Sequence, residues 1–155
     1  MSEDSTAAVG SRGRAYTTKQ MGDACEMLVA AELTLAGVPA LKAPDYWPGY
    51  DVIAQPRGAA PQKISVKSRT FKKGAAFVSY SAVDDFDWLA IVLLPGEGCP
   101  SRHIYVVPRS IADKNARTYV AQKMLNHREY RIDEVGRKFA EYENNFSLRE
   151  AENRG

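Results

Sequence analysis

Four polar residues, spread over three segments of the chain, have side chains suited to the hydrolysis of a phosphodiester bond. Asp51 lies in the short apolar run YDVIA, while Ser65 and Lys67 share one side of the run KISVKSR if that run is a strand. Glu26 lies upstream, in a segment with a helical pattern. Carboxylate oxygens bind Mg²⁺, a bound metal polarises phosphate and activates water, and an ammonium offsets the developing negative charge. These residue types are therefore candidates for one metal-dependent site.

The segments that carry the four residues are predicted to form a helix followed by a β-hairpin. The helix spans about 18 residues, with Thr17 or Thr18 as its cap and Gly37 at its end. Residues 50–55 and 62–69 are predicted to pair as antiparallel strands, because the Pro- and Gly-rich turn QPRGAAPQ joins them. With the helix packed across this hairpin, Glu26 can approach the sheet edge that carries Asp51.

The rest of the chain predicts a single mixed α/β (α+β) domain. Three further strands are expected at residues 75–81, 87–95 and 102–108, and the charged segments after Pro108 have a helical character. A helix, about five strands and then helices indicate a mixed central sheet flanked by helices. The domain is expected to span residues 18–150, between a flexible N-terminal tail of residues 1–17 and a C-terminal tail of residues 151–155.

The composition allows one globular domain and excludes several other classes of protein. The chain has 155 residues and a formal net charge of only +2, so any surface for nucleic acid must be local. The sequence contains no P-loop, no zinc-ligand spacing and no G-x-S-x-G elbow. No apolar run approaches the ~20 residues of a membrane span, and no signal peptide is recognisable, so a cytoplasmic protein without a membrane partner is expected.

The ordered runs GDACEMLVAAELTLAG, YDVIA and ISVKS resemble the PD-(D/E)xK nuclease superfamily. The resemblance covers roughly residues 20–70 and is strongest to the branch with a G-x-x-x-E helix and an (E/Q)-V-K-(T/S) strand. It implies a restriction-endonuclease-like fold and Mg²⁺- or Mn²⁺-dependent cleavage of DNA. It also implies metal ligands at Asp51, Glu26 and Val66, and a catalytic lysine at Lys67.

The position of the metal-binding aspartate is the first departure from the superfamily pattern. Tyr50 precedes Asp51, whereas the superfamily name implies proline, and the literal Pro44-Asp45 falls in a predicted loop. We prefer Asp51 because the hairpin would place it opposite the strand that carries Lys67.

Ser65 is the more serious departure, because this branch has glutamate or glutamine at its position. Serine removes a carboxylate that would bind the metal, although some restriction enzymes of the superfamily read S-x-K and take the acid from a later helix. The sequence leaves open whether Glu26 fills the gap or whether another acid does so; the other candidates are Asp84, Asp85, Asp87 and Glu32. If none does, the chain is a catalytically inactive nuclease-like domain that binds nucleic acid or a protein partner.

Structural interpretations compete with each of these functional ones. The polar side of KISVKSR can be a solvated strand face with a surface ion pair, and Glu26 can be an edge residue of an amphipathic helix. Glu32 is expected to be a structural ion-pair partner of a lysine or arginine. Asp84 and its neighbours can simply cap a short helical turn.

The expected partner of the site is DNA, and a second copy of the chain is possible. Lys63, Arg69, Lys72 and Lys73 lie on or just after the candidate strand and could contact phosphates. Cutting both strands of a duplex usually takes two sites, which two-fold symmetry supplies. A homodimer built partly on residues 109–150 is therefore a further prediction.

Overall fold

The computed structural model describes residues 14–150, so most of the predicted N-terminal tail and all of the predicted C-terminal tail lie outside the described residues. The described part begins with helix α2 (Thr18–Leu35), which Thr17 caps as predicted. The Thr17 side chain accepts a hydrogen bond from the Gln20 N–H at 3.1 Å, and the Gln20 side chain accepts one from the Thr17 N–H at 2.9 Å. This reciprocal capping box satisfies two backbone donors at the helix start.

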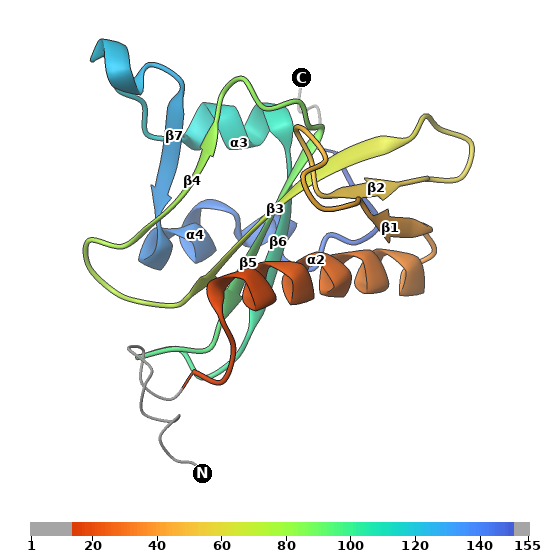
Figure 1. Ribbon diagram of the computed structural model, residues 1–155, viewed down its shortest axis with the longest axis horizontal. Coiled ribbons are helices and arrows are strands. Elements are labelled where there is room, and N and C mark those ends of the chain that lie inside the picture. Colours follow the sequence, from red (N-terminus) through yellow and green to blue (C-terminus); the bar gives the residue numbers. More distant parts are fainter. Residues whose placement is uncertain (1–13, 151–155) are drawn as a thin grey trace.

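Five strands form the central sheet, in the order β1-β2-β3-β5-β6 (Figure 1). Only β3 and β5 run parallel, so the sheet is mixed, as the element order predicted. The predicted hairpin is also confirmed, because β2 and β3 pair antiparallel with Val52 opposite Ile64. The bounds of the five strands are β1 (Ala40–Lys42), β2 (Val52–Ala54), β3 (Gln62–Thr70), β5 (Trp88–Leu94) and β6 (His103–Pro108).

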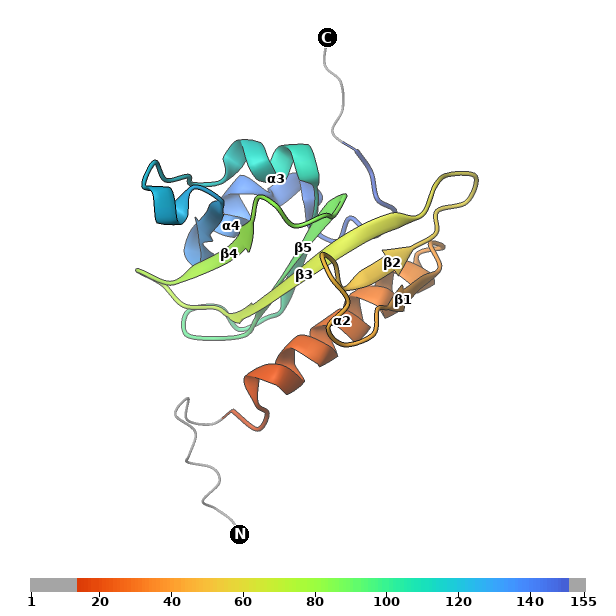
Figure 2. The same ribbon diagram turned by 45° about the horizontal axis from the view of Figure 1, so that its top comes forward.

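The two faces of the sheet are covered by different layers (Figure 2). Helix α2 packs on one face, where Val29 and Leu33 join a core that includes Ile64 and Trp88. The opposite face packs against a second core that contains Leu89. That core is covered by α3 (Arg109–Asn115), α4 (Ile132–Lys138) and a two-stranded sheet of β4 (Phe77–Ser81) and β7 (His127–Arg131).

Three details of the sequence prediction were wrong. Residues 40–42, for which no strand was predicted, form the edge strand β1. The predicted strand at residues 75–81 exists as β4 but pairs with β7 outside the central sheet. The C-terminal region is less helical than expected, because it contains β7, two seven-residue helices and two single turns, η1 (Gln122–Met124) and η2 (Ala140–Tyr142). Among the described helices, none is long and apolar enough to cross a membrane.

Candidate functional site

Asp51 is fixed at the point where β2 begins. Its N–H donates to the Ile64 carbonyl at 2.9 Å, and its carbonyl accepts from the Ala43 N–H at 2.8 Å. Its carboxylate Oδ2 accepts a hydrogen bond from the Val66 N–H at 2.8 Å. Two hydrogen bonds therefore fix the backbone of Asp51, and a third orients its carboxylate toward β3.

The backbone of Val66 faces the same edge as the Asp51 carboxylate. Along β3, even-numbered residues turn their N–H and C=O groups toward β2, as the bond from Asp51 to the Ile64 carbonyl shows. Strand β2 pairs with β3 only over residues 62–64, so Val66 lies just beyond the paired part. By this alternation, the Val66 carbonyl oxygen points to the open edge where Asp51 lies.

Glu26 and Asp51 line the same cavity, of about 290 Å³, between the first half of α2 and residues 43–47. Only 19% of the Glu26 side chain is exposed. Burial raises the pKa of Glu26, and the negative charge of Asp51 raises it further, against the opposing effect of Lys42. The structure thus brings together the two carboxylates that the sequence pattern singled out.

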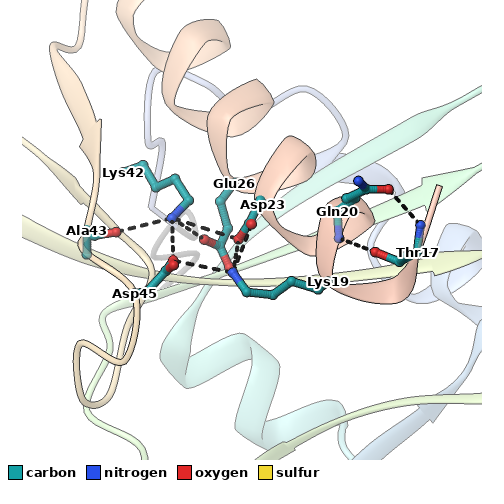
Figure 3. A network of polar contacts seen from close by, with 8 residues as sticks. All are labelled: Thr17, Lys19, Gln20, Asp23, Glu26, Lys42, Ala43 and Asp45. Atoms are coloured by element: carbon teal, nitrogen blue, oxygen red, sulfur yellow. Dashed lines mark hydrogen bonds and ion pairs between the residues drawn. The ribbon is translucent and has the colours of Figure 1, made fainter.

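The Glu26 carboxylate belongs to a cluster of charged side chains at the cavity (Figure 3). Its other members are Lys19, Asp23, Lys42 and Asp45. The Lys42 ammonium lies 3.4 Å from Glu26 Oε1, 3.2 Å from Asp45 Oδ1 and 3.9 Å from Asp23 Oδ1. Lys19 pairs with Asp23 at 2.8 Å and with Asp45 at 3.4 Å. The ammonium of Lys42 therefore stands where the surrounding carboxylates attract a cation.

This part of the site was not predicted from the sequence. Asp51 was preferred to Asp45 because Pro44-Asp45 falls in a predicted loop, and neither Asp23 nor Lys42 was among the candidate residues. The literal Pro-Asp pair was nevertheless a usable signal, because the loop that contains it forms one wall of the cavity.

The donor atoms at this edge fit Mg²⁺ or Mn²⁺. Asp51, Glu26 and the Val66 carbonyl offer oxygen atoms, which hard cations prefer. Among the described residues, no group of three His, Cys, Asp or Glu side chains could hold a metal by itself. Mg²⁺ commonly needs only one or two carboxylates and keeps several waters. Space is also present, because a Cβ added to Gly22, on the cavity wall, would meet nothing within 4 Å.

Ser65 and Lys67 lie on the face of β3 opposite α2 and do not line this cavity. Ser65 is only 3% exposed, which rules out a fully solvated strand face. Lys67 is half-buried, and its ammonium makes no hydrogen bond or ion pair with any residue that the structure describes. A half-buried ammonium without a protein partner is available to an anion.

The alternative acids do not reach the cavity. Asp85 pairs with the Lys63 ammonium at 2.6 Å, and Asp87 accepts from the Lys63 N–H at 2.9 Å. Asp84 accepts a weak hydrogen bond within its own turn, at 3.4 Å. Glu32 makes no ion pair within residues 14–150, so its expected role as an ion-pair partner is not seen.

The four cations expected to contact phosphate differ in their availability. Lys63 is neutralised by Asp85, and Arg69 donates to the carbonyls of Ser68 and Phe77. Lys72 and Lys73 are exposed and make no polar contact with the described residues. The expectation of phosphate contacts therefore rests mainly on these last two lysines.

Glu26→Gln is expected to stabilise the protein at pH 8. The folded state raises the pKa of Glu26, so its stability falls as pH rises through the range in which Glu26 loses its proton. Glutamine removes that cost, although Lys42 loses one of its partners. We expect a melting temperature higher by roughly 2–4 °C, the size of a change of about 1 kcal/mol in a domain of this length.

The matched control is Glu32→Gln, on the same helix but without an ion pair to a described residue. Melting curves from pH 3.5 to 8 should show a gain for Glu26→Gln that grows with pH and vanishes near pH 4, and no such trend for Glu32→Gln. A loss of stability for Glu26→Gln at pH 8 would contradict the assignment of repulsion between the two carboxylates.

Comparison with known proteins adds a likeness in structure. No protein-family model and no curated protein sequence matches the chain. The bacterial homing endonuclease I-Ssp6803I is similar, with a TM-score of 0.55 and 20% identity over 85% of this chain and 90% of that one. Hjc, a Holliday junction resolvase of the archaeal hyperthermophile Archaeoglobus fulgidus, gives a TM-score of 0.45 and 14% identity, over 74% and 90%. The first likeness shows a restriction-endonuclease-like fold and confirms, at the level of the fold, the resemblance stated from the sequence.

Proposed function

We propose that this chain is a metal-dependent endonuclease that hydrolyses phosphodiester bonds of DNA. The observation that carries the proposal is the Asp51 carboxylate, which the Val66 N–H fixes at the wall of a cavity that it shares with Glu26. A fold shared with a homing endonuclease supports the same substrate class. The expected homodimer and cytoplasmic location stay predictions.

In this proposal Asp51, Glu26 and the Val66 carbonyl hold Mg²⁺ or Mn²⁺. The bound ion supplies a Lewis acid that polarises the phosphodiester and lowers the pKa of a coordinated water. The Val66 N–H orients the Asp51 carboxylate, and two backbone hydrogen bonds fix the residue that carries it, whereas the Glu26 carboxylate is paired with Lys42. The Lys42 ammonium would therefore compete with the metal ion for the Glu26 carboxylate.

Lys67 is the residue proposed to act on the substrate directly. It follows Val66 on β3, and its ammonium has no partner among the described residues. A phosphate at the open edge of β3 would provide that partner, and the positive charge would offset the charge that develops on the phosphate oxygens. Ser65, buried beside it in the strand, offers a hydroxyl in place of the carboxylate usual in this branch.

A nuclease-like domain that binds nucleic acid or a protein partner without cutting remains the second candidate function. Two observations favour it: Ser65 supplies no carboxylate, and the described residues contain no group of three side chains that could hold a metal. Under this second function the cavity would keep Lys42 as its permanent cation.

Cleavage of supercoiled plasmid, with calorimetric titration of Mg²⁺ and Mn²⁺, separates the two functions. For the endonuclease we expect nicked or linear product that needs the metal and disappears with EDTA. Ser65→Glu should then bring little gain, because a further negative charge joins Asp51 and Glu26. In a domain that has lost its activity, Ser65→Glu should instead strengthen metal binding. If neither the wild type nor Ser65→Glu binds Mg²⁺ or Mn²⁺ at millimolar concentration, the endonuclease proposal is wrong.

A further inference from the structure

Residues 114–131, here called the basic arm, have a larger net positive charge than the protein as a whole. The arm contains five cationic residues and one carboxylate, a formal net charge of +4, whereas the chain has +2, so the remaining residues sum to −2. The arm consists of the end of α3, a loop with the turn η1, and β7. In Figure 1 it lies at the end of the molecule opposite β1 and β2.

The single carboxylate of the basic arm, Glu129, serves as an internal anchor. Its side chain is only 9% exposed and accepts hydrogen bonds from the Tyr119 hydroxyl and from His127 Nε2, the latter at 2.7 Å. Backbone bonds between Arg117 and Glu129, of 2.9 and 3.3 Å, close the loop at its base. The arm is therefore an ordered loop whose one negative charge is turned inward.

The cations of the basic arm are largely left to solvent. Lys114 and Lys123 are exposed and make no hydrogen bond or ion pair with residues 14–150. The Arg117 side chain is 60% exposed and lies 4.0 Å from Glu129. Arg128 donates only to backbone carbonyls, whereas Arg131 pairs with Asp133 at 2.8 Å. An ordered surface with unpaired positive charge is complementary to a polyanion.

We propose that the basic arm docks the phosphate backbone of duplex DNA, as a second contact outside the cavity of Asp51 and Glu26. The proposal rests on the proposed function only in taking DNA as the ligand. A second copy of this chain is a poorer occupant, because a two-fold interface centred on the arm would place one +4 surface against another. Phosphate contacts give affinity without sequence preference, so the arm would position the duplex and not select its sequence.

The test is the salt dependence of binding to a fluorescent 20-base-pair duplex, measured by anisotropy in EDTA between 50 and 200 mM salt. The double variant Lys114→Gln, Lys123→Gln removes two exposed charges. We expect the slope of log K against log salt to become shallower by about 1.8, close to 0.9 for each lost contact, and the affinity to fall at least about tenfold. The control Arg57→Gln, Arg102→Gln makes the same charge change on exposed residues outside the arm and should change the slope by less than about 0.5.

Equal slopes for the wild type and the arm variant would overturn the proposal, and so would equal changes in the arm and control variants, which would show an effect of net charge alone. Both lysines are exposed, so the melting temperature of the double variant should equal that of the wild type. The single variant Lys123→Gln serves as a second test and should give half the change in slope. The two proposals can fail separately. Absence of metal binding and of cleavage in the wild type would refute the endonuclease, whereas an unchanged salt slope in the arm variant would refute only the docking role of the arm.

Discussion

Replacing Lys67 by methionine is expected to lower the rate of plasmid cleavage by roughly 10²–10³-fold, the usual cost of removing one group that stabilises transition-state charge. Methionine keeps an unbranched apolar stem in the half-buried position but removes the ammonium. The ammonium repels a cation and is no ligand, so metal binding should survive. The rise of melting temperature with added Mg²⁺ should therefore match that of the wild type.

Lys63→Met is the matched control, on the same side of the same strand. Its ammonium is already paired with Asp85 at 2.6 Å, so its loss should change cleavage by no more than a few-fold. Cleavage by Lys67→Met at the wild-type rate would remove Lys67 from the mechanism. If cleavage and the response to Mg²⁺ were lost together, Lys67 would have a structural role instead.

The parts of the fold that the sequence predicted are those with local signals. Thr17 and Gln20 mark the start of α2 by their spacing, and the alternation around Ile64 together with the Pro- and Gly-rich turn specifies the β2–β3 hairpin. The pairing of β4 with β7 was missed because it joins Val78 to Tyr130, across more than fifty residues. A charged run such as HREYR becomes a strand only when its partner strand is present.

The candidate site, like the fold, could be predicted from the sequence only in part. The spacing of the motif pointed to Asp51 and Glu26, and the structure places them in one cavity. The cluster around Lys42 joins residues of α2, β1 and the following loop, so no period in the sequence reveals it. The burial of Ser65 could not be read from the sequence either, because its strand alternates and the opposite layer is formed by segments farther along the chain.

Asp51→Asn is expected to abolish both metal binding and cleavage while leaving the fold intact. The asparagine side-chain oxygen can still accept the Val66 N–H, so the geometry at the start of β2 is kept and only the charge is lost. In the wild type, 10 mM Mg²⁺ at a Kd of about 1 mM would stabilise the folded state by about 1.4 kcal/mol, or roughly 3–5 °C in melting temperature. The variant should show no such rise, and its melting temperature without metal should exceed that of the wild type at pH 8, because the repulsion on Glu26 is gone.

Lys42→Met removes a positive charge at the cavity from which Asp51→Asn removes a negative charge. Because the two substitutions should change metal affinity in opposite directions, Lys42→Met is a control for general damage to the site. Its ammonium lies 3.4 Å from Glu26 and 3.2 Å from Asp45, so its loss should destabilise the metal-free protein. The freed carboxylates should then bind Mg²⁺ more tightly, by roughly fivefold, since two charges about 4 Å apart in water interact by about 1 kcal/mol. Titration calorimetry of the wild type, Asp51→Asn and Lys42→Met would show this order directly. Weaker Mg²⁺ binding by Lys42→Met, or unchanged Mg²⁺ binding by Asp51→Asn, would contradict a metal site between Asp51 and Glu26. An ion at that site would be bound by Asp51 and repelled by Lys42, so both substitutions must change its affinity in the stated directions.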